Sequence, residues 1–268
     1  MKPRGIYLRG DKKAVYSNSF ETRRWLSTEY VDFWLTTQEQ EEGRRSLRRK
    51  LVSLLPFELK TELRILDIGA GGGALSLEIL NNFPQTQVIC QDFSAAMLAQ
   101  AAKNLAAFSD RTKFVQSDLA DPVWTQSISG TFDAVVSSLV MHTVPDRVKD
   151  LYCEVLTLIK PGGCFIFADN LAPPGPIFEH VYLKERLLAR QAKIKMETGF
   201  TKSLEDIEIE MRSGRRTHER GFPDRARDPL ITTLTLAHHL EWLTQAGFNE
   251  VDCLWKEMRH AVIGGFKP

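Results

Sequence analysis

The chain has 268 residues, enough for one large α/β domain with an insertion or for two small domains. Its hydrophobic fraction of 43%, charged fraction of 26% and formal net charge of +1 give no global reason to expect nucleic-acid or membrane binding. No apolar run reaches membrane-spanning length, and no signal-peptide core is visible. The four cysteines are too widely separated for a zinc site or a disulfide framework, which favours a cytoplasmic location; they are Cys90, Cys153, Cys164 and Cys253.

Residues 1–60 are expected to form a helical N-terminal extension. Aromatic residues and leucines recur at helical spacing over 21–26 and 30–55, and Pro56 ends the pattern. The basic run over 44–50 keeps an apolar stripe, so we interpret it as a solvated helix face rather than a polyanion site. That stripe consists of Leu47, Leu51 and Leu54.

From residue 63 onward, strand-like and helix-like patterns alternate. Five strands are predicted at 63–68, 88–90, 113–115, 132–137 and 164–168. Helices are predicted between them at 74–83, from a cap at Ser94 to 105, and at 148–159. This alternation predicts βαβ units in a mostly parallel sheet, so residues 61–170 are expected to form the core. In such sheets, ligands bind beyond the carboxyl ends of the strands.

Residues 171–230 interrupt this rhythm and are expected to form a helical insert. An arginine-rich stretch over 212–227 allows two interpretations, which are ion pairing along a helix and an anion-recognising lid. The core is expected to be completed by residues 231–268. There we predict a helix over 232–246, ended by Gly247, and two strands at 251–255 and 261–266 that form an antiparallel hairpin.

The most informative motif is the glycine loop at 66–73, between a predicted strand and a predicted helix. Gly69, Gly71 and Gly73 permit a sharp turn and close approach of a ligand to the backbone. The helix that follows offers free N–H groups at its positive end. Asp67 would repel a pyrophosphate but attract a cationic amine. The loop also contains Gly-x-Gly-x-x-Ala, so alone it permits a dinucleotide site, whereas the absence of Gly-Lys-Ser/Thr excludes a triphosphatase loop.

Further carboxylates follow the next two predicted strands. Asp92 ends the second strand, where it can accept hydrogen bonds from both hydroxyls of a ribose. Asp118 follows the third, where it could accept from an adenine amino group. For each, the alternative is a helix cap or a solvated turn. With the later segments 132–138 and 160–163, these motifs make residues 62–170 resemble the class I S-adenosylmethionine-dependent methyltransferases, and the patterns at 246–248 and 264–267 extend the resemblance.

The resemblance implies a three-layer Rossmann-like α/β fold with a seven-stranded, mostly parallel sheet whose last strand is antiparallel. It implies S-adenosylmethionine as cofactor and a small molecule, not nucleic acid, as methyl acceptor. It assigns the glycine turn to the methionine part of the cofactor, Asp92 to the ribose, Asp118 to the adenine and Asp67 to the amino group. The expected cofactor-binding residues are Asp67, Gly69, Ala70, Gly71, Gly73, Asp92, Phe93, Met97, Asp118, Leu119 and Ser137.

His142 is the best-placed candidate for a general base, which a hydroxyl or ammonium acceptor would require. The segment 137–142 leaves the fourth predicted strand toward the mouth of the cleft, and small-molecule members of the family often carry histidine there. The alternative is that His142 only packs on the cofactor or caps the next helix.

Candidates for the acceptor pocket are Asp169, Asn170 and His239. The Asp169-Asn170 pair resembles the magnesium-binding pair of catechol-type O-methyltransferases. Those enzymes also need an aspartate at the end of the fourth strand, where this chain has Ser138, so no metal is expected. His239 shares a helix face with leucines, which makes a core histidine the default interpretation. The segments 1–60 and 171–230 are expected to cover the acceptor.

Three other functions are compatible with parts of this pattern. A carboxy-S-adenosylmethionine synthase or tRNA-modification enzyme is loosely similar in its helical insert and C-terminal segments, although its characteristic glycine-loop sequence is absent. A nicotinamide-dependent oxidoreductase is disfavoured by Asp67 and by the closing hairpin. A non-catalytic adenosylmethionine-binding protein also fits, because the cofactor motifs say nothing about turnover. The oligomeric state cannot be deduced from these patterns.

Overall fold

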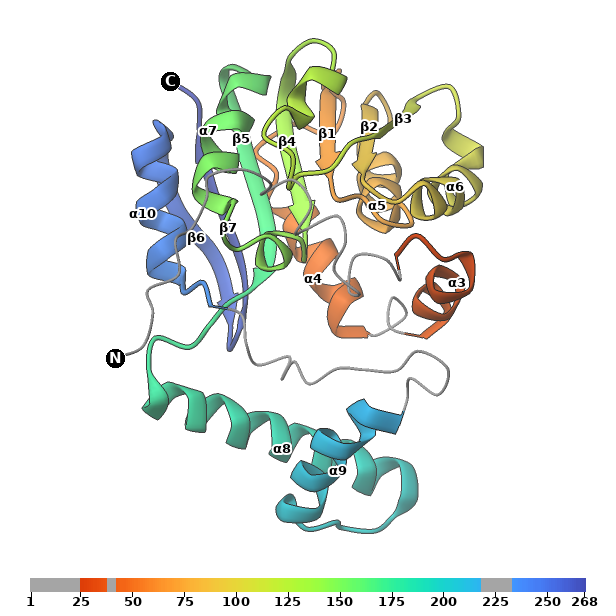
Figure 1. Ribbon diagram of the computed structural model, residues 1–268, viewed down its shortest axis with the longest axis vertical. Coiled ribbons are helices and arrows are strands. Elements are labelled where there is room, and N and C mark those ends of the chain that lie inside the picture. The colour runs from red at the N-terminus through yellow and green to blue at the C-terminus, as the bar shows by residue number, and fades with distance from the viewer. Residues whose placement is uncertain (1–24, 38–41, 218–232) are drawn as a thin grey trace, which may run out of the picture.

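A computed structural model describes residues 25–37, 42–217 and 233–268. Its centre is a seven-stranded sheet with the strand order β3-β2-β1-β4-β5-β7-β6 (Figure 1). The first five strands pair in parallel, and β7 is antiparallel to both of its neighbours. The predicted fold class is therefore confirmed. The strands are β1 Arg64–Ile68, β2 Gln87–Asp92, β3 Thr112–Gln116, β4 Phe132–Ser138, β5 Ile159–Asn170, β6 Asn249–Glu257 and β7 His260–Phe266.

Helices cover both faces of the sheet and produce two hydrophobic clusters. One face packs against α4 (Glu42–Ser53), α5 (Ala74–Asn82) and α6 (Ala95–Asn104). The other packs against α7 (Val148–Leu158) and α10 (Leu236–Ala246). Side chains alternate between the two faces along each strand. On β5, for example, Phe165 and Phe167 contact Tyr152 of α7, whereas Ile166 and Ala168 belong to the α4 and α5 side.

The N-terminal extension contributes α3 (Thr28–Thr37) and α4, which lie at the carboxyl edge of the sheet (Figure 1). Leu47 and Leu51 of the predicted stripe are buried, and Leu54 is half-buried. Arg48 is an exception to the predicted solvated basic face, because only 8% of it is exposed. The predicted helix over 21–26 lies almost entirely outside the described residues.

Leu51 anchors α4 to the sheet, and it has 0% exposure. We expect Leu51→Ala to lower the free energy of unfolding by about 2–5 kcal/mol, because the truncation leaves a cavity in the core. Urea denaturation would measure the change. The matched control is Leu59→Ala at a leucine that is 60% exposed, which should change stability by less than about 0.5 kcal/mol. Equal effects of the two substitutions would contradict this packing of α4.

Several element boundaries differ from their predictions, and two of these differences have a direct structural cause. The helix predicted from residue 232 begins at Leu236, because the Thr235 side chain accepts a hydrogen bond from the His238 N–H and caps it there. The strand predicted at 164–168 extends over Ile159–Asn170, with a register shift opposite the start of β4. Gly162 takes a left-handed conformation in that shift, so the Lys-Pro-Gly-Gly segment ends α7 but stays within the strand.

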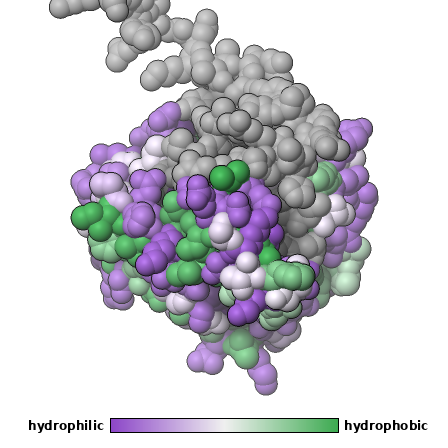
Figure 2. Space-filling model, turned by 90° about the horizontal axis from the view of Figure 1, so that it is seen from below, coloured by the Kyte–Doolittle hydropathy of each residue, from purple (hydrophilic) through white to green (hydrophobic). Residues whose placement is uncertain are grey.

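The insert forms two helices beyond the carboxyl edge of the sheet, α8 (Pro176–Thr198) and α9 (Leu204–Thr217) (Figure 1). On α8 only Leu187 is buried. Seen from that side, hydrophobic and hydrophilic residues are interspersed over the part of the surface that is coloured (Figure 2). Most of the arginine-rich stretch over 212–227, for which ion pairing and an anion-recognising lid are the two interpretations, lies outside the described residues. Within the described part of the chain, no helix combines the length and hydropathy needed to cross a membrane.

Candidate active site

The glycine loop turns between β1 and α5 through left-handed backbone. Gly69, Gly71 and Gly73 have φ values of 67°, 54° and 81°, which L side chains rarely adopt. A Cβ on Gly69 would also collide with the side chain of Val140 from the loop after β4. The predicted need for glycine at these positions therefore has a direct steric reason.

Side chains from β2 hold this loop in place. The Gly69 N–H donates to Oε1 of Gln91 at 3.0 Å, and Nε2 of Gln91 donates to the Ser117 carbonyl at 2.5 Å. The Gly71 N–H donates to Asp92 Oδ2 at 2.8 Å. These bonds connect the carboxyl ends of β1, β2 and β3. Sequence reasoning missed Gln91, because no local pattern distinguishes a bridging glutamine from a solvated one.

Asp92 is buried with 6% exposure at the end of β2, as predicted. Burial raises the pKa of its carboxyl to about 6, although the Ser94 and Gly71 N–H groups favour the ionised form. Asp67 is also buried and accepts a hydrogen bond from Ser76 Oγ at 2.7 Å. Burial raises the pKa of Asp67 to about 7, against the stabilising bond from Ser76. Two carboxyls that titrate near neutrality thus lie beside the loop.

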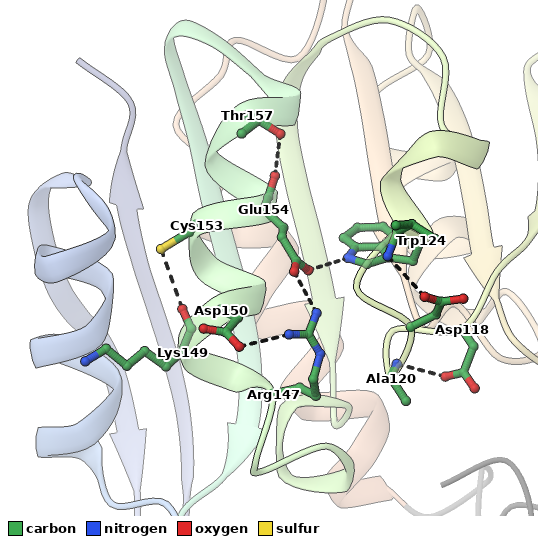
Figure 3. Close-up of polar contacts among 11 residues, drawn as sticks. Asp118, Ala120, Trp124, Arg147, Lys149, Asp150, Cys153, Glu154 and Thr157 are labelled. Atoms are coloured by element: carbon green, nitrogen blue, oxygen red, sulfur yellow. Dashed lines mark hydrogen bonds and ion pairs between the residues drawn. The ribbon is translucent and has the colours of Figure 1, made fainter. Parts of the chain in front are cut away.

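Asp118 follows β3 in a tight turn, where its Oδ1 accepts the Ala120 N–H at 2.9 Å (Figure 3). The same loop is fixed to α7 through Trp124, whose indole N–H donates to Glu154 at 2.7 Å (Figure 3). Arg147 donates to the other oxygen of Glu154 at 2.6 Å. The loop after β3 and the loop after β4 are therefore fixed to one another through a single carboxylate.

The remaining predicted cofactor residues line the same edge or support it. Ala70 donates to the Gln91 carbonyl at 2.8 Å, and Ser137 Oγ donates to the Ile68 carbonyl at 2.8 Å. Met97 and Leu119 are buried, whereas Phe93 is half-buried. The structure thus groups all of the predicted cofactor residues around the carboxyl ends of β1 to β4. Their contact with a cofactor stays a prediction.

His142 lies in a short 3₁₀ turn, Met141–Thr143, directly beyond β4. Its Nδ1 is 2.5 Å from Oδ1 of Asp169, and its backbone N–H donates to Oδ2 at 2.9 Å. Leu139, with φ of 62°, turns the chain toward this arrangement. His142 keeps 29% of its side chain exposed, whereas Asp169 has none. The imidazole is therefore fixed at one nitrogen and remains partly exposed to solvent.

Both carboxylate oxygens of Asp169, at the end of β5, accept hydrogen bonds from other groups of the protein. Besides His142, the Asn170 N–H donates to its Oδ1 at 2.7 Å. Burial opposes its ionisation, but the charge and hydrogen bond of His142 outweigh it, so the pKa of Asp169 is lowered. In the described part of the chain, no three His, Cys, Asp or Glu side chains are grouped to hold a metal ion.

His239 is buried with 1% exposure between α10 and the sheet. Its Nδ1 is 2.5 Å from Tyr152 Oη, and its ring packs on Phe167 at 5.4 Å between centroids. Burial lowers the pKa of His239 to about 4, so the ring is neutral at physiological pH. These contacts fit a satisfied core histidine, and its predicted role in substrate binding stays a prediction.

Part of this chain is similar to known protein families and structures. Residues 65–163 match a family described as a methyltransferase domain. They form a class I S-adenosylmethionine-dependent methyltransferase domain. The matched range includes the glycine loop, Asp92, Asp118 and His142.

Several curated relatives are methyltransferases. The chain is 32% identical over 128 residues to a malonyl-[acyl-carrier protein] O-methyltransferase from Halalkalibacterium halodurans, covering 46% of each chain. It is 30% identical over 181 residues to a trans-aconitate 2-methyltransferase from Deinococcus radiodurans, covering 66% of this chain and 60% of that one. A carboxy-S-adenosyl-L-methionine synthase from Nautilia profundicola is 22% identical over 216 residues, covering 81% and 82%. The chain spans about half the length of the first relative.

Solved methyltransferase structures share the fold. Human N-acetylserotonin methyltransferase in complex with S-adenosylmethionine superposes with a TM-score of 0.57 at 17% identity, covering 94% of this chain and 59% of that one. The structure of PigF with S-adenosylhomocysteine gives 0.60 at 15% identity, covering 93% and 62%. At these identities the likeness concerns the fold alone.

The methyltransferase domain has polar groups suited to its cofactor. The Ser117 and Ser138 hydroxyls lie at the carboxyl ends of β3 and β4, are buried, and have no hydrogen-bond partner among the described residues. A buried hydroxyl without a partner costs free energy, and a polar ligand at this edge would relieve that cost. Together with the glycine turn and the Asp92 carboxylate, these hydroxyls form a set of polar groups that fits S-adenosylmethionine.

Proposed function

We propose that this chain transfers a methyl group from S-adenosylmethionine to a small-molecule acceptor, and that His142 takes a proton from the attacking hydroxyl or ammonium. The observation that carries this proposal is the His142–Asp169 pair, which lies at the same edge of the sheet as the glycine loop. A base is useful only where an acceptor can reach both it and the cofactor.

The chain's own residues would hold the cofactor by complementary charge and hydrogen bonding. The glycine turn would receive the methionine part, Asp92 would accept from the ribose hydroxyls, and Asp118 would accept from the adenine amino group. When bound, S-adenosylmethionine supplies a methyl group already activated on a sulfonium. The protein's main contribution is then to position the acceptor in line and to exclude water.

Asp169 would orient His142 for proton transfer. If Nδ1 carries the proton and donates to the buried carboxylate, Nε2 is left as an acceptor. A nitrogen in that state can remove a proton from an acceptor hydroxyl as the new bond forms. We assign His142 as the catalytic residue and Asp169 as a positioning residue.

The helices outside the core would cover the acceptor. On this proposal residues 1–60 and 171–230 form the cover, while residues 61–170 and 231–268 form the core. The described parts support it, because α3, α8 and α9 lie beyond the carboxyl edge of the sheet (Figure 1). Cytoplasmic location and the absence of a nucleic-acid partner stay predictions.

Calorimetric titration with S-adenosylmethionine, S-adenosylhomocysteine and NAD tests the cofactor assignment. We expect saturable binding of the first two and none of NAD. Tight NAD binding without adenosylmethionine binding would refute the proposal in favour of an oxidoreductase. Binding without adenosylhomocysteine release, across a panel of acids, phenols and amines, would indicate a non-catalytic binding protein.

A carboxy-S-adenosylmethionine synthase is the second candidate, because the likeness to one covers 82% of that relative. Mass spectrometry of the nucleoside products distinguishes the two activities. Methyl transfer releases adenosylhomocysteine, whereas the synthase yields a carboxylated adenosylmethionine. Detection of the carboxylated product without methylated acceptor would replace the methyltransferase proposal.

Cofactor affinity should fall in acid because of Asp92. Its pKa is raised to about 6, so the carboxylate that accepts the ribose hydroxyls is lost as the pH falls below 6. We expect the Kd for adenosylhomocysteine to rise about tenfold for each pH unit below 6. In Asp92→Asn, the affinity for adenosylhomocysteine should be weak at every pH, and the rise in Kd that comes from protonation of Asp92 should be absent. A wild-type Kd that stays constant from pH 7 to pH 5 would contradict the role of Asp92.

A further inference from the structure

The last residue of β5 and the first residue of β7 present side chains on the face that packs against α4. Asn170 pairs with His260 of β7 in the antiparallel register, so both side chains lie on one face of the sheet. Two residues earlier on that face, Ala168 pairs with Val262, and both belong to the cluster that contains Leu51 of α4. Asn170 and His260 therefore continue the α4 face beyond the hydrophobic core, at the carboxyl end of β5.

Arg44 extends the same face of α4 in the same direction. It lies three and seven residues before Leu47 and Leu51, which places the three side chains on one side of the helix. Its guanidinium carbon is 4.8 Å from the centre of the Trp34 ring, a cation–π contact that fixes the head group. Helix α4 packs against both β5 and β7, the strands that carry Asn170 and His260. The positive charge of Arg44 is among the causes that lower the pKa of His260, after burial.

None of these three side chains has a polar partner within the part of the chain that the structure describes. The Arg44 guanidinium makes no ion pair, and the Asn170 carboxamide and His260 imidazole make no hydrogen bond. Two acidic groups lie nearby: Asp169 is paired with His142, and Glu257 is exposed opposite His260 on the hairpin. Neither forms an ion pair with Arg44.

The chemistry of the three groups selects a particular kind of ligand. A guanidinium presents planar, forked N–H donors that match the two oxygens of a carboxylate, and an amide and an imidazole can each add one more donor. The Arg44 guanidinium is permanently charged, which suits the negative charge of a carboxylate. We propose that Arg44, Asn170 and His260 bind a carboxylate of the methyl acceptor.

This inference rests on the proposed function for identifying the ligand as the acceptor. Successive strand residues point to opposite faces, so Asn170 faces α4 while Asp169 faces His142. A carboxylate held by Arg44 would leave the rest of the acceptor to cross the edge of the sheet toward His142. The acceptor class is then a hydroxy acid, whose carboxylate is bound on one face and whose hydroxyl loses its proton on the other.

Calorimetry on the full chain loaded with adenosylhomocysteine tests the carboxylate site, with the hydroxy acids para-hydroxybenzoate and meta-hydroxybenzoate as probes. We expect at least one acid to bind saturably, and the uncharged methyl ester of para-hydroxybenzoate to bind at least about tenfold more weakly than the acid. Arg44→Gln should weaken acid binding about 10–100-fold, the loss expected for a hydrogen-bonded charge. The acid affinity of Arg44→Lys should lie between those of the wild type and Arg44→Gln, because lysine keeps the positive charge but lacks the paired N–H donors of a guanidinium.

Arg49→Gln is the matched control, since Arg49 is exposed on the same helix and pairs with Glu42 at 3.0 Å. It should leave acid binding unchanged, and both variants should keep wild-type adenosylhomocysteine affinity and melting temperature. Loss of adenosylhomocysteine binding in Arg44→Gln would overturn the inference, because Arg44 would then hold the cofactor's own carboxylate. Equal binding of acid and ester, or tighter binding of inorganic phosphate, would also overturn it.

The two proposals fail in different ways. If the wild-type chain binds no adenosylhomocysteine, the proposed function fails, and the acids can still be titrated into the unloaded protein. If it binds adenosylhomocysteine but neither acid, the carboxylate site is refuted while the methyltransferase proposal stands.

Discussion

His142→Ala is expected to lower kcat for a hydroxyl acceptor by about 10²–10⁴-fold, the usual contribution of a positioned general base. The affinity for S-adenosylmethionine should stay within about twofold, because the residues expected to hold the cofactor lie on other loops. Initial rates of adenosylhomocysteine release and calorimetric Kd values measure the two effects separately. An unchanged kcat would refute the role of His142 as a base.

Asp169→Asn tests whether the buried carboxylate sets the state of that base. An amide at this position would present its N–H₂ group or its oxygen to Nδ1, so the proton could move to Nε2 and block proton removal. We expect kcat to fall with KM little changed, and the pH dependence of kcat to shift relative to the wild type. A purely structural role would lower stability without moving that pH profile.

Asp92→Ala is expected to abolish detectable cofactor binding, with a loss of at least about 10²-fold. On the proposed function, the variant would lose the two hydrogen bonds that the Asp92 carboxylate is expected to accept from the ribose hydroxyls. It also leaves the Gly71 N–H without its acceptor at 2.8 Å, which loosens the loop. Titration with adenosylhomocysteine measures the loss. Asp110→Ala, at an exposed aspartate beyond α6, is the control and should bind as the wild type does; equal binding by both variants would contradict the assignment.

The fold could be predicted because its signals are local and repeated. Apolar runs predict the strands of the core, and the glycine loop predicts the turn after β1. Ser94 was predicted as a helix cap, and its Oγ does accept the Met97 N–H at 3.1 Å. Boundaries were less well predicted where local and long-range effects compete. Thr235 caps α10 later than the pattern suggested, and β5 gains residues because its neighbours pair with them.

The sequence predicts several of the residues that lie at the candidate site, but it does not predict which of them contact one another. Sequence patterns indicated His142 and Asp169 for separate roles, and only the structure shows that they are paired. Gln91, which holds the glycine loop, and Arg44, which we propose as a carboxylate ligand, could not be predicted as site residues, because their roles depend on elements far away in the sequence. Arg44 in particular looks like any member of a solvated basic run until α4 is packed against β5 and β7.

The most direct test of the account is transfer of a radiolabelled methyl group from S-adenosylmethionine to a hydroxy acid such as para-hydroxybenzoate. The account predicts label in the extracted acceptor with the wild-type chain, and about 10²-fold less with His142→Ala at full cofactor occupancy. Full occupancy by adenosylmethionine with no label in any acid, phenol or amine acceptor would contradict it.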